Sequence, residues 1–121
     1  MSRYFLEIAY DGSAYHGWQV QLNALTVQEV VDNRLSTLLQ ETVTSVGCGR
    51  TDTGVHAEQF YLHFDLQESL PQDRDLVHQL NRVLPDDIVA LRLLPVATDA
   101  HARFDAVERV YQYRIIHRKD P

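Results

Sequence analysis

The stretch RYFLEIAY (residues 3–10) carries large apolar side chains at alternate positions. Its apolar members recur at every second position, at Tyr4, Leu6, Ile8 and Tyr10. Side chains two residues apart face the same side of an extended chain, so the pattern predicts a strand with one face toward a core. Short runs rich in branched and aromatic residues predict four more strands, within residues 43–48, 60–66, 87–96 and 107–117.

Two segments between these strands repeat apolar residues with the spacing of an amphipathic helix. In the first, residues 26–40, Thr26 is followed by Glu29 three positions later, which is the pattern of a capping box. Its apolar stripe comprises Val27, Val30, Val31, Leu35, Leu38 and Leu39. The second helix is expected over residues 73–84, before Pro85. Its expected inward side chains are Leu76, Val77, Leu80, Val83 and Leu84.

The resulting order is strand, helix, strand, strand, helix, strand, and then one further strand. This order predicts an α+β, ferredoxin-like βαββαβ sheet with two helices on one face and an extra C-terminal strand. The 121 residues suffice for one domain. Because the last strand follows a complete unit, we expect it to be the first strand of something longer.

Composition restricts the function only in part. Apolar runs are too short for a membrane span, and the single cysteine, Cys48, gives neither an internal disulfide nor a zinc cluster, so a cytoplasmic protein is expected. The net charge of -6 argues against a nucleic-acid partner. However, ten of the eleven basic residues are arginine, and five of the eleven follow residue 100. Arginine suits phosphate contacts and stacking, although drift of composition explains the pattern equally well.

The stretch GCGRTDTGVHA (residues 47–57) places one carboxylate, Asp52, among three glycines, two threonines, an arginine and a histidine. Glycines permit a tight loop with backbone close to a ligand, and a carboxylate there is a candidate nucleophile or base. Arg50 is placed to keep that carboxylate ionised, or to contact a phosphate. A plain connection in which Asp and Thr cap a turn accounts for the same residues.

Two other motif interpretations are weaker. DTG (residues 52–54) is the tripeptide of aspartic proteases, but an apolar strand does not directly precede it. Arg50 also lies too close for carboxylates that share a proton. YDGS (residues 10–13) is faintly similar to a phosphatase loop. However, the first aspartate of that loop, expected two residues before Asp11, is missing, because Ala9 stands there.

Five motifs in order resemble the TruA-type tRNA pseudouridine synthases. These are YDGSAYHGWQVQ (10–21), TVQEVV (26–31), GRTDTGVHA (49–57), LNRVLPDDI (80–88) and DAHARFDAVERVYQYRI (99–115). They cover nearly the whole chain, but members of the family are about twice as long. Two local departures are Thr53, where alanine is usual, and Gln59-Phe60, where Gly-Gln is usual. The resemblance implies that residues 1–121 are the N-terminal domain of such an enzyme, with the C-terminal half absent.

The resemblance also implies roles for particular residues. Asp52 matches the family's essential aspartate, which acts either as a nucleophile at C1′ or as a base toward the C2′ proton. Arg50 and Arg103 match substrate or RNA contacts, and Tyr111 matches the tyrosine that packs on the target base. For Arg103, structural ion pairing is an equally good interpretation. For Arg50, the alternative is a plain salt bridge with Asp52, and both roles can hold at once.

Gly54 and His56 are expected to support the loop that carries Asp52. In the YHGWQ motif, His16 and Trp18 are candidates to face RNA, with a core position for Trp18 at least as well supported. The family isomerises uridine to pseudouridine at nucleotides 38, 39 and 40 of the tRNA anticodon stem-loop. It uses no cofactor and no metal and works as a homodimer. A half-length piece is expected to be inactive or weak, and a non-catalytic RNA-binding module is the alternative.

Overall fold

The computed structural model describes residues 1–48 and 57–100. In chain order the elements are β1 (Ser2–Tyr10), the 3-10 turn η1 (Gly12–Ala14), α1 (Val27–Leu39), β2 (Val46–Gly47), β3 (Ala57–Leu66), α2 (Leu76–Val83) and β4 (Ile88–Val96). The predicted fifth strand, within residues 107–117, lies outside the described residues.

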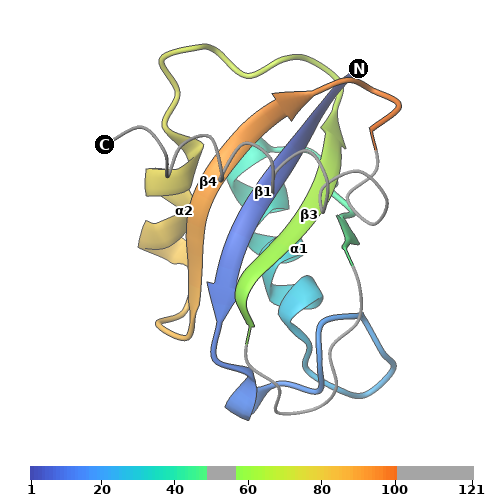
Figure 1. Cartoon of the computed structure of the whole chain (residues 1–121), viewed down its shortest axis with the longest axis vertical. Helices are drawn as coiled ribbons and strands as arrows, with labels where there is room; N and C mark the ends of the chain where they lie inside the picture. Colours follow the sequence, from blue (N-terminus) through green and yellow to red (C-terminus); the bar gives the residue numbers. More distant parts are fainter. Residues whose placement is uncertain (49–56, 101–121) are drawn as a thin grey trace, which may run out of the picture.

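The strands form one antiparallel sheet in the order β2-β3-β1-β4. Both helices lie on the same side of this sheet, behind it in Figure 1. A sheet in which β1 lies between β3 and β4, with two helices on one face, is the ferredoxin-like arrangement. The predicted α+β fold is therefore confirmed.

The main core lies between the sheet and the helices. The helix-facing side of β1 is buried at all four alternating positions, Tyr4, Leu6, Ile8 and Tyr10. The apolar stripe of α1 is confirmed as well, since its members are either buried or packed against the same core. Thr26 caps α1 by accepting a hydrogen bond from the Glu29 N–H at 3.4 Å. The local pattern and the observed packing agree because both depend on one-sided burial.

Helix α2 departs from its predicted inward face at one position. Leu76, Leu80 and Leu84 are buried, but Val83 is 41% exposed. The helix ends at Val83, and Leu84 takes an extended conformation that turns its own side chain inward. The prediction for Val83 was therefore wrong, because Leu84, just past the end of the helix, is buried at this point instead.

Strand β2 is shorter than predicted. Only Val46 and Gly47 pair with β3, although the sequence predicts a strand over residues 43–48. The preceding backbone is held by α1 instead: the Val43 N–H donates to Ser36 Oγ at 2.8 Å. Since these side-chain partners replace a strand neighbour, the segment leading to β2 does not join the ladder.

Among the described residues, no helix is long and apolar enough to cross a membrane.

Candidate functional site

All six residues that the sequence marks as site residues lie outside the described part of the chain. Asp52, Arg50, Gly54 and His56 fall within residues 49–56, and Arg103 and Tyr111 fall within residues 101–121. Their assignments therefore stay predictions. The structure does describe the residues on either side of the Asp52 segment, which end at Cys48 and resume at Ala57.

The Asp52 segment is joined to the sheet at both of its ends. On its N-terminal side, the Cys48 N–H donates to the carbonyl of Tyr61 at 2.7 Å and extends the pairing of β2 with β3. On its C-terminal side, Ala57 is the first residue of β3 and pairs with Tyr10, the last residue of β1. Tyr10 is also the first residue of the YDGS motif. The Asp52 segment therefore re-enters the sheet beside the start of that motif.

Trp18 lies over the N-terminal end of this segment. Its indole is 2% exposed and packs against Phe60, with ring centroids 4.5 Å apart. A Cβ added to Gly47 would meet the indole at Nε1 and at Cε2, the latter 2.8 Å away, so only glycine fits beneath the ring. Of the two interpretations of Trp18, the core position is confirmed and the RNA-facing one is wrong.

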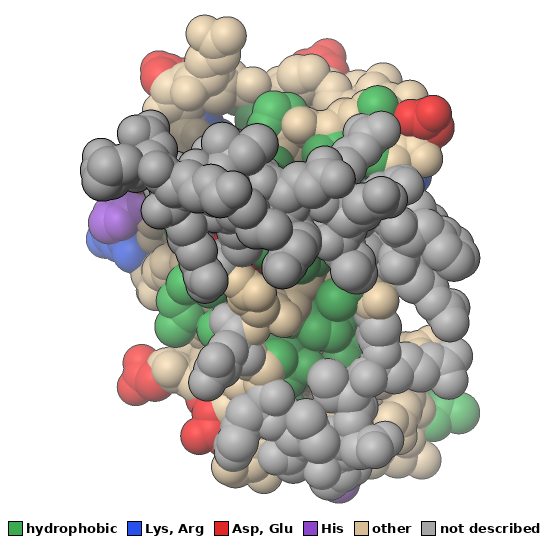
Figure 2. Space-filling view, in the orientation of Figure 1, with side chains coloured by type: hydrophobic (Ala, Val, Ile, Leu, Met, Phe, Trp, Pro, Cys, Tyr) green, Lys and Arg blue, Asp and Glu red, His purple; other side chains and the backbone are tan. Residues whose placement is uncertain are grey.

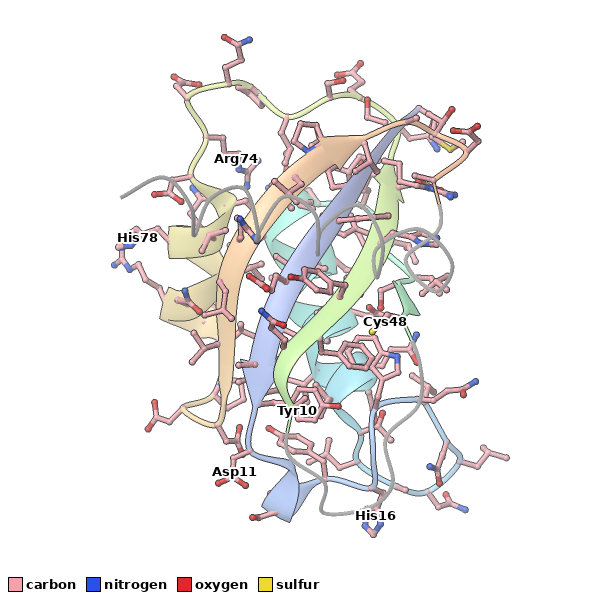
Figure 3. The ribbon with its side chains drawn as sticks, in the orientation of Figure 1. Tyr10, Asp11, His16, Cys48, Arg74 and His78 are labelled. Carbon is pink, nitrogen blue, oxygen red and sulfur yellow. The ribbon has the colours of Figure 1, made fainter. Side chains whose placement is uncertain are left out.

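The segment from Tyr15 to Leu25 forms a loop with a defined backbone. The His16 N–H donates to the carbonyl of Leu25 at 2.8 Å, and the Gln21 amide donates to the carbonyl of His16 at 3.0 Å. Gly17 has a φ of 81°, a left-handed conformation that favours glycine. His16 is exposed and lies toward the same end of the molecule as Tyr10 and Asp11 (Figure 3).

This loop also carries no charge, since residues 12–25 contain neither acidic nor basic side chains apart from His16. Its exposed side chains mix amides with apolar groups, and Leu22 is 93% exposed. In a protein with a net charge of -6, an uncharged loop is a place where a polyanion meets little repulsion.

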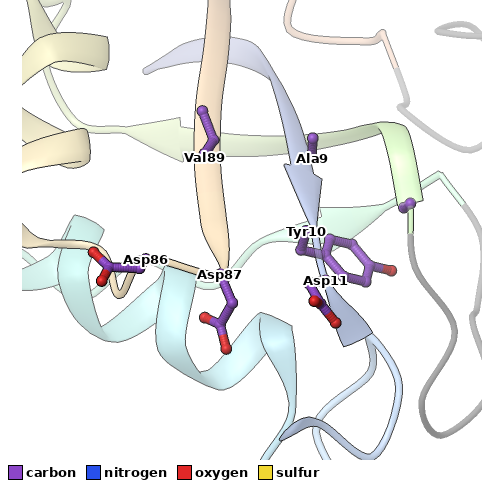
Figure 4. A pocket seen from close by; sticks show the side chains of 7 residues that line it. Ala9, Tyr10, Asp11, Asp86, Asp87 and Val89 are labelled. Carbon is purple, nitrogen blue, oxygen red and sulfur yellow. The ribbon is translucent and has the colours of Figure 1, made fainter. Parts of the chain in front are cut away.

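A cavity of about 340 Å³ opens where β1, β3 and β4 meet this end of the sheet (Figure 4). It is lined by Ala9, Tyr10, Asp11, Ala57, Asp86, Asp87 and Val89. Two of its carboxylates have structural partners: Asp11 accepts from the Ser13 N–H, and Asp87 accepts from the Tyr15 hydroxyl at 2.6 Å. Burial, together with this hydrogen bond to Asp87, raises the pKa of Tyr15. The acidic lining does not suit a phosphate.

The face of β1 that points away from the helices is buried too, a feature that sequence reasoning missed. Phe5 is 1% exposed and Glu7 3% exposed. The Tyr61 hydroxyl donates to the Glu7 carboxylate, and Arg92 Nη2 lies 3.7 Å from Glu7 Oε1. On this side of the molecule, Figure 2 shows hydrophobic side chains toward the middle and acidic ones at the rim. In the sequence, the sign of this second buried face is Glu7, a charged residue between apolar neighbours in β1.

Most arginines among the described residues are engaged within the protein. Arg3 forms a two-point ion pair with Asp65, at 2.7 and 2.9 Å, and this pairing lowers the pKa of Asp65. Arg34 and Arg74 donate to backbone carbonyls, and Arg92 lies beside Glu7. Most basic side chains within the described ranges are thus occupied by partners in the protein itself. Within those ranges, no group of three or more His, Cys, Asp or Glu side chains is arranged to hold a metal ion.

Cys48 is half-buried at the end of β2, and burial raises the pKa of its thiol. A thiol whose pKa is raised stays protonated at neutral pH and is a poor nucleophile. The structure thus supports the interpretation of Cys48 as a packing residue rather than a nucleophile.

Comparison with known proteins identifies relatives along the whole chain. No protein-family model matches. Three relatives named tRNA pseudouridine synthase A come from Porphyromonas gingivalis, Azobacteroides pseudotrichonymphae and Parabacteroides distasonis. They are 48%, 48% and 45% identical over 121 or 122 residues, which is all of this chain and 48% of each relative. The chain spans about half the length of the curated relatives it matches, and its resemblance to the TruA-type tRNA pseudouridine synthases is confirmed.

Proposed function

We propose that this protein isomerises uridine to pseudouridine in tRNA. The observation that carries the proposal is the 45–48% identity, over the whole chain, to proteins named tRNA pseudouridine synthase A. The fold supports it, because the ends of the Asp52 segment are held by β2, β3 and β1 at one end of a single sheet.

In the proposed reaction, Asp52 is the catalytic carboxylate. The bond between C1′ and N1 of the uridine breaks, the released uracil turns, and a new bond forms between C1′ and C5. N1 gains a proton and C5 loses one, so the reaction is an isomerisation that needs no oxidant. An ionised carboxylate beside the ribose serves either attack at C1′ or removal of the C2′ proton. The target base must leave its stack to reach it.

The other predicted residues have roles in binding. Arg50 and Arg103 contact the RNA, Tyr111 stacks on the target base, and Gly54 and His56 support the loop. A ring that stacks on a base contributes roughly 1–3 kcal/mol. The exposed, uncharged loop around His16 adds a surface that approaches RNA without repulsion. We further propose nucleotides 38, 39 and 40 of the anticodon stem-loop as targets, and a cytoplasmic homodimer as the working form.

The test is conversion of uridine to pseudouridine in an anticodon stem-loop RNA, measured with the full-length product of the gene and with residues 1–121 alone. We expect conversion by the full-length protein and little or none by the 121-residue chain. Asp52→Ala is expected to abolish conversion and to leave the Kd for the RNA within about twofold. Asp73→Ala removes an exposed carboxylate from the loop before α2 and serves as the matched control.

Each outcome has a distinct meaning. Loss of conversion in Asp52→Ala with retained binding supports the enzyme. RNA binding without conversion by the unchanged protein would instead indicate a non-catalytic RNA-binding module. Equal rates for Asp52→Ala and the unchanged protein would refute the role of this carboxylate.

A further inference from the structure

Gln28, in the first turn of α1, uses both ends of its side-chain amide. Its Oε1 accepts a hydrogen bond from the Val20 N–H at 2.9 Å, and its Nε2 donates to the carbonyl of Ser45 at 2.7 Å. The side chain is buried, at 9% exposure. One amide therefore joins two segments that are 25 residues apart in the chain: the uncharged loop of residues 15–25 and the stem of residues 45–48, which leads into the Asp52 segment.

Other groups of α1 reinforce the same connection. The backbone N–H of Gln28 donates to the carbonyl of Trp18 at 2.9 Å, and the Val27 N–H donates to the carbonyl of Gly17 at 3.2 Å. One turn later, the Asp32 carboxylate accepts from the Ser45 N–H at 3.3 Å. Both backbone polar groups of Ser45 are thus held by side chains of α1.

The stem needs such support because β2 is short. It pairs with β3 at only two positions, and among the described residues no strand pairs with its other edge. A two-residue strand contributes little on its own. The position of Cys48, the last described residue before the Asp52 segment, therefore depends on α1 as well as on β3.

We propose that Gln28 is a positioning residue, which sets the uncharged loop and the stem of the Asp52 segment at a fixed distance from each other. The inference rests on the proposed function, in which the stem places the catalytic carboxylate and the loop approaches the RNA. A small displacement of a catalytic group lowers a rate strongly, by about 100-fold for a shift of 1 Å. A shift in the loop is instead expected to weaken RNA binding.

Two substitutions separate the two connections. Gln28→Glu keeps an oxygen that accepts from Val20 but loses the donor to Ser45. We therefore expect a single-turnover rate of pseudouridine formation reduced about tenfold, with the Kd for RNA within about twofold. Gln28→Met has a similar shape and loses both hydrogen bonds. It is expected to lower the rate to a similar extent and to raise the Kd as well.

Asn81 provides the control. Its amide on α2 makes the same pair of bonds, both of 2.8 Å, to the N–H and the carbonyl of Ala90 on β4. It is more exposed than Gln28, and it joins α2 to β4, which is the edge strand opposite β2. Asn81→Leu is expected to lower the urea midpoint and to leave the single-turnover rate of the folded protein unchanged. A rate loss in Asn81→Leu as large as that in Gln28→Met would overturn the positioning role.

Amide hydrogen exchange tests the inference without catalysis. Gln28→Met is expected to speed exchange at the Val20 and Cys48 amides about tenfold or more, whereas Gln28→Glu does so at Cys48 alone. Unchanged exchange at Cys48 in both variants refutes the inference. If the unchanged full-length protein forms no pseudouridine, the proposed function fails, and the exchange measurement still decides whether Gln28 fixes the two segments.

Discussion

Gly47→Ala is the substitution whose outcome the packing defines most sharply. Gly47 lies in β2 beneath the indole of Trp18, and an added methyl group would approach Trp18 Cε2 to 2.8 Å and Phe60 Cζ to 2.9 Å. Carbon atoms in contact normally lie about 3.5–4.0 Å apart. Neither ring has room to withdraw, since Trp18 is 2% exposed and Phe60 is 4% exposed.

The expected cost is that of an overpacked core, about 1–3 kcal/mol of unfolding free energy. For a domain of this size, each kcal/mol lowers the Tm by roughly 3–6 °C. Urea denaturation followed by tryptophan fluorescence measures the loss directly, because Trp18 is the single tryptophan and lies at the site. Val46→Ala, at the neighbouring exposed position, is the control and is expected to change stability by less than about 0.5 kcal/mol.

A double-mutant cycle isolates the clash. Trp18→Phe removes the atoms that the new methyl group would meet first, so Gly47→Ala should cost at least about 1 kcal/mol less in that background. In the Trp18→Phe background, the unfolding is followed by circular dichroism. The reasoning is refuted if Gly47→Ala leaves the urea midpoint unchanged, or if its cost is the same with and without the indole.

The remaining predictions concern polar side chains, some buried and some partly exposed, and the pH dependence of their contributions to stability. Asp65→Asn should cost roughly 0.5–1 kcal/mol at pH 7 by breaking the partly exposed pair with Arg3. Because the folded-state pKa of Asp65 is lowered, this difference should shrink as the pH falls below about 3.8, which urea midpoints at pH 7 and pH 3 will check. Burial raises the pKa of Asp32, so its protonated carboxyl group contributes stability at low pH, and this contribution is lost as the pH rises through the folded-state pKa. Asp32→Asn, which keeps an acceptor for the Ser45 N–H, should therefore stabilise the protein at pH 7 by up to about 1 kcal/mol, and a lower urea midpoint would contradict this. Ser45 Oγ is buried without a hydrogen-bond partner among the described residues, so Ser45→Ala should be neutral within about 0.5 kcal/mol or stabilising, as judged by thermal unfolding.

The acidic cavity at the end of the sheet separates structural carboxylates from the candidate catalytic one. Asp87 accepts from Tyr15, and the Asp11 N–H donates to the carbonyl of Asp87 at 2.9 Å. These contacts join the YDGS turn to the start of β4. Asp11 is therefore explained by the fold, which weakens further the interpretation of the YDGS motif as a phosphatase loop.

Local patterns predicted those features that depend on burial from one side. The alternation of β1, the capped apolar stripe of α1 and the order of elements led to the ferredoxin-like sheet, because the period of a strand or helix records which side meets the core. The candidate site residues came from motifs and from a family resemblance. All six lie outside the described residues, so their positions stay predictions.

The remaining features follow from contacts between distant segments, which no local period records. Trp18 was ambiguous in the sequence, and it is buried because Gly47 and Phe60, about 30 and 40 residues further along the chain, form its pocket. Glu7 breaks an apolar run, and only the pairing of β1 with β3 and β4 places it beside Tyr61 and Arg92.

Gln28 likewise carries no special signal in the sequence, where it is one polar residue of a predicted helix. The fold alone brings the Val20 N–H and the Ser45 carbonyl within reach of its two ends. A buried amide needs both a donor and an acceptor, and those partners exist only once the chain has folded. Local patterns thus predict the described elements and their order, whereas contacts that form only on folding select the polar side chains that connect them.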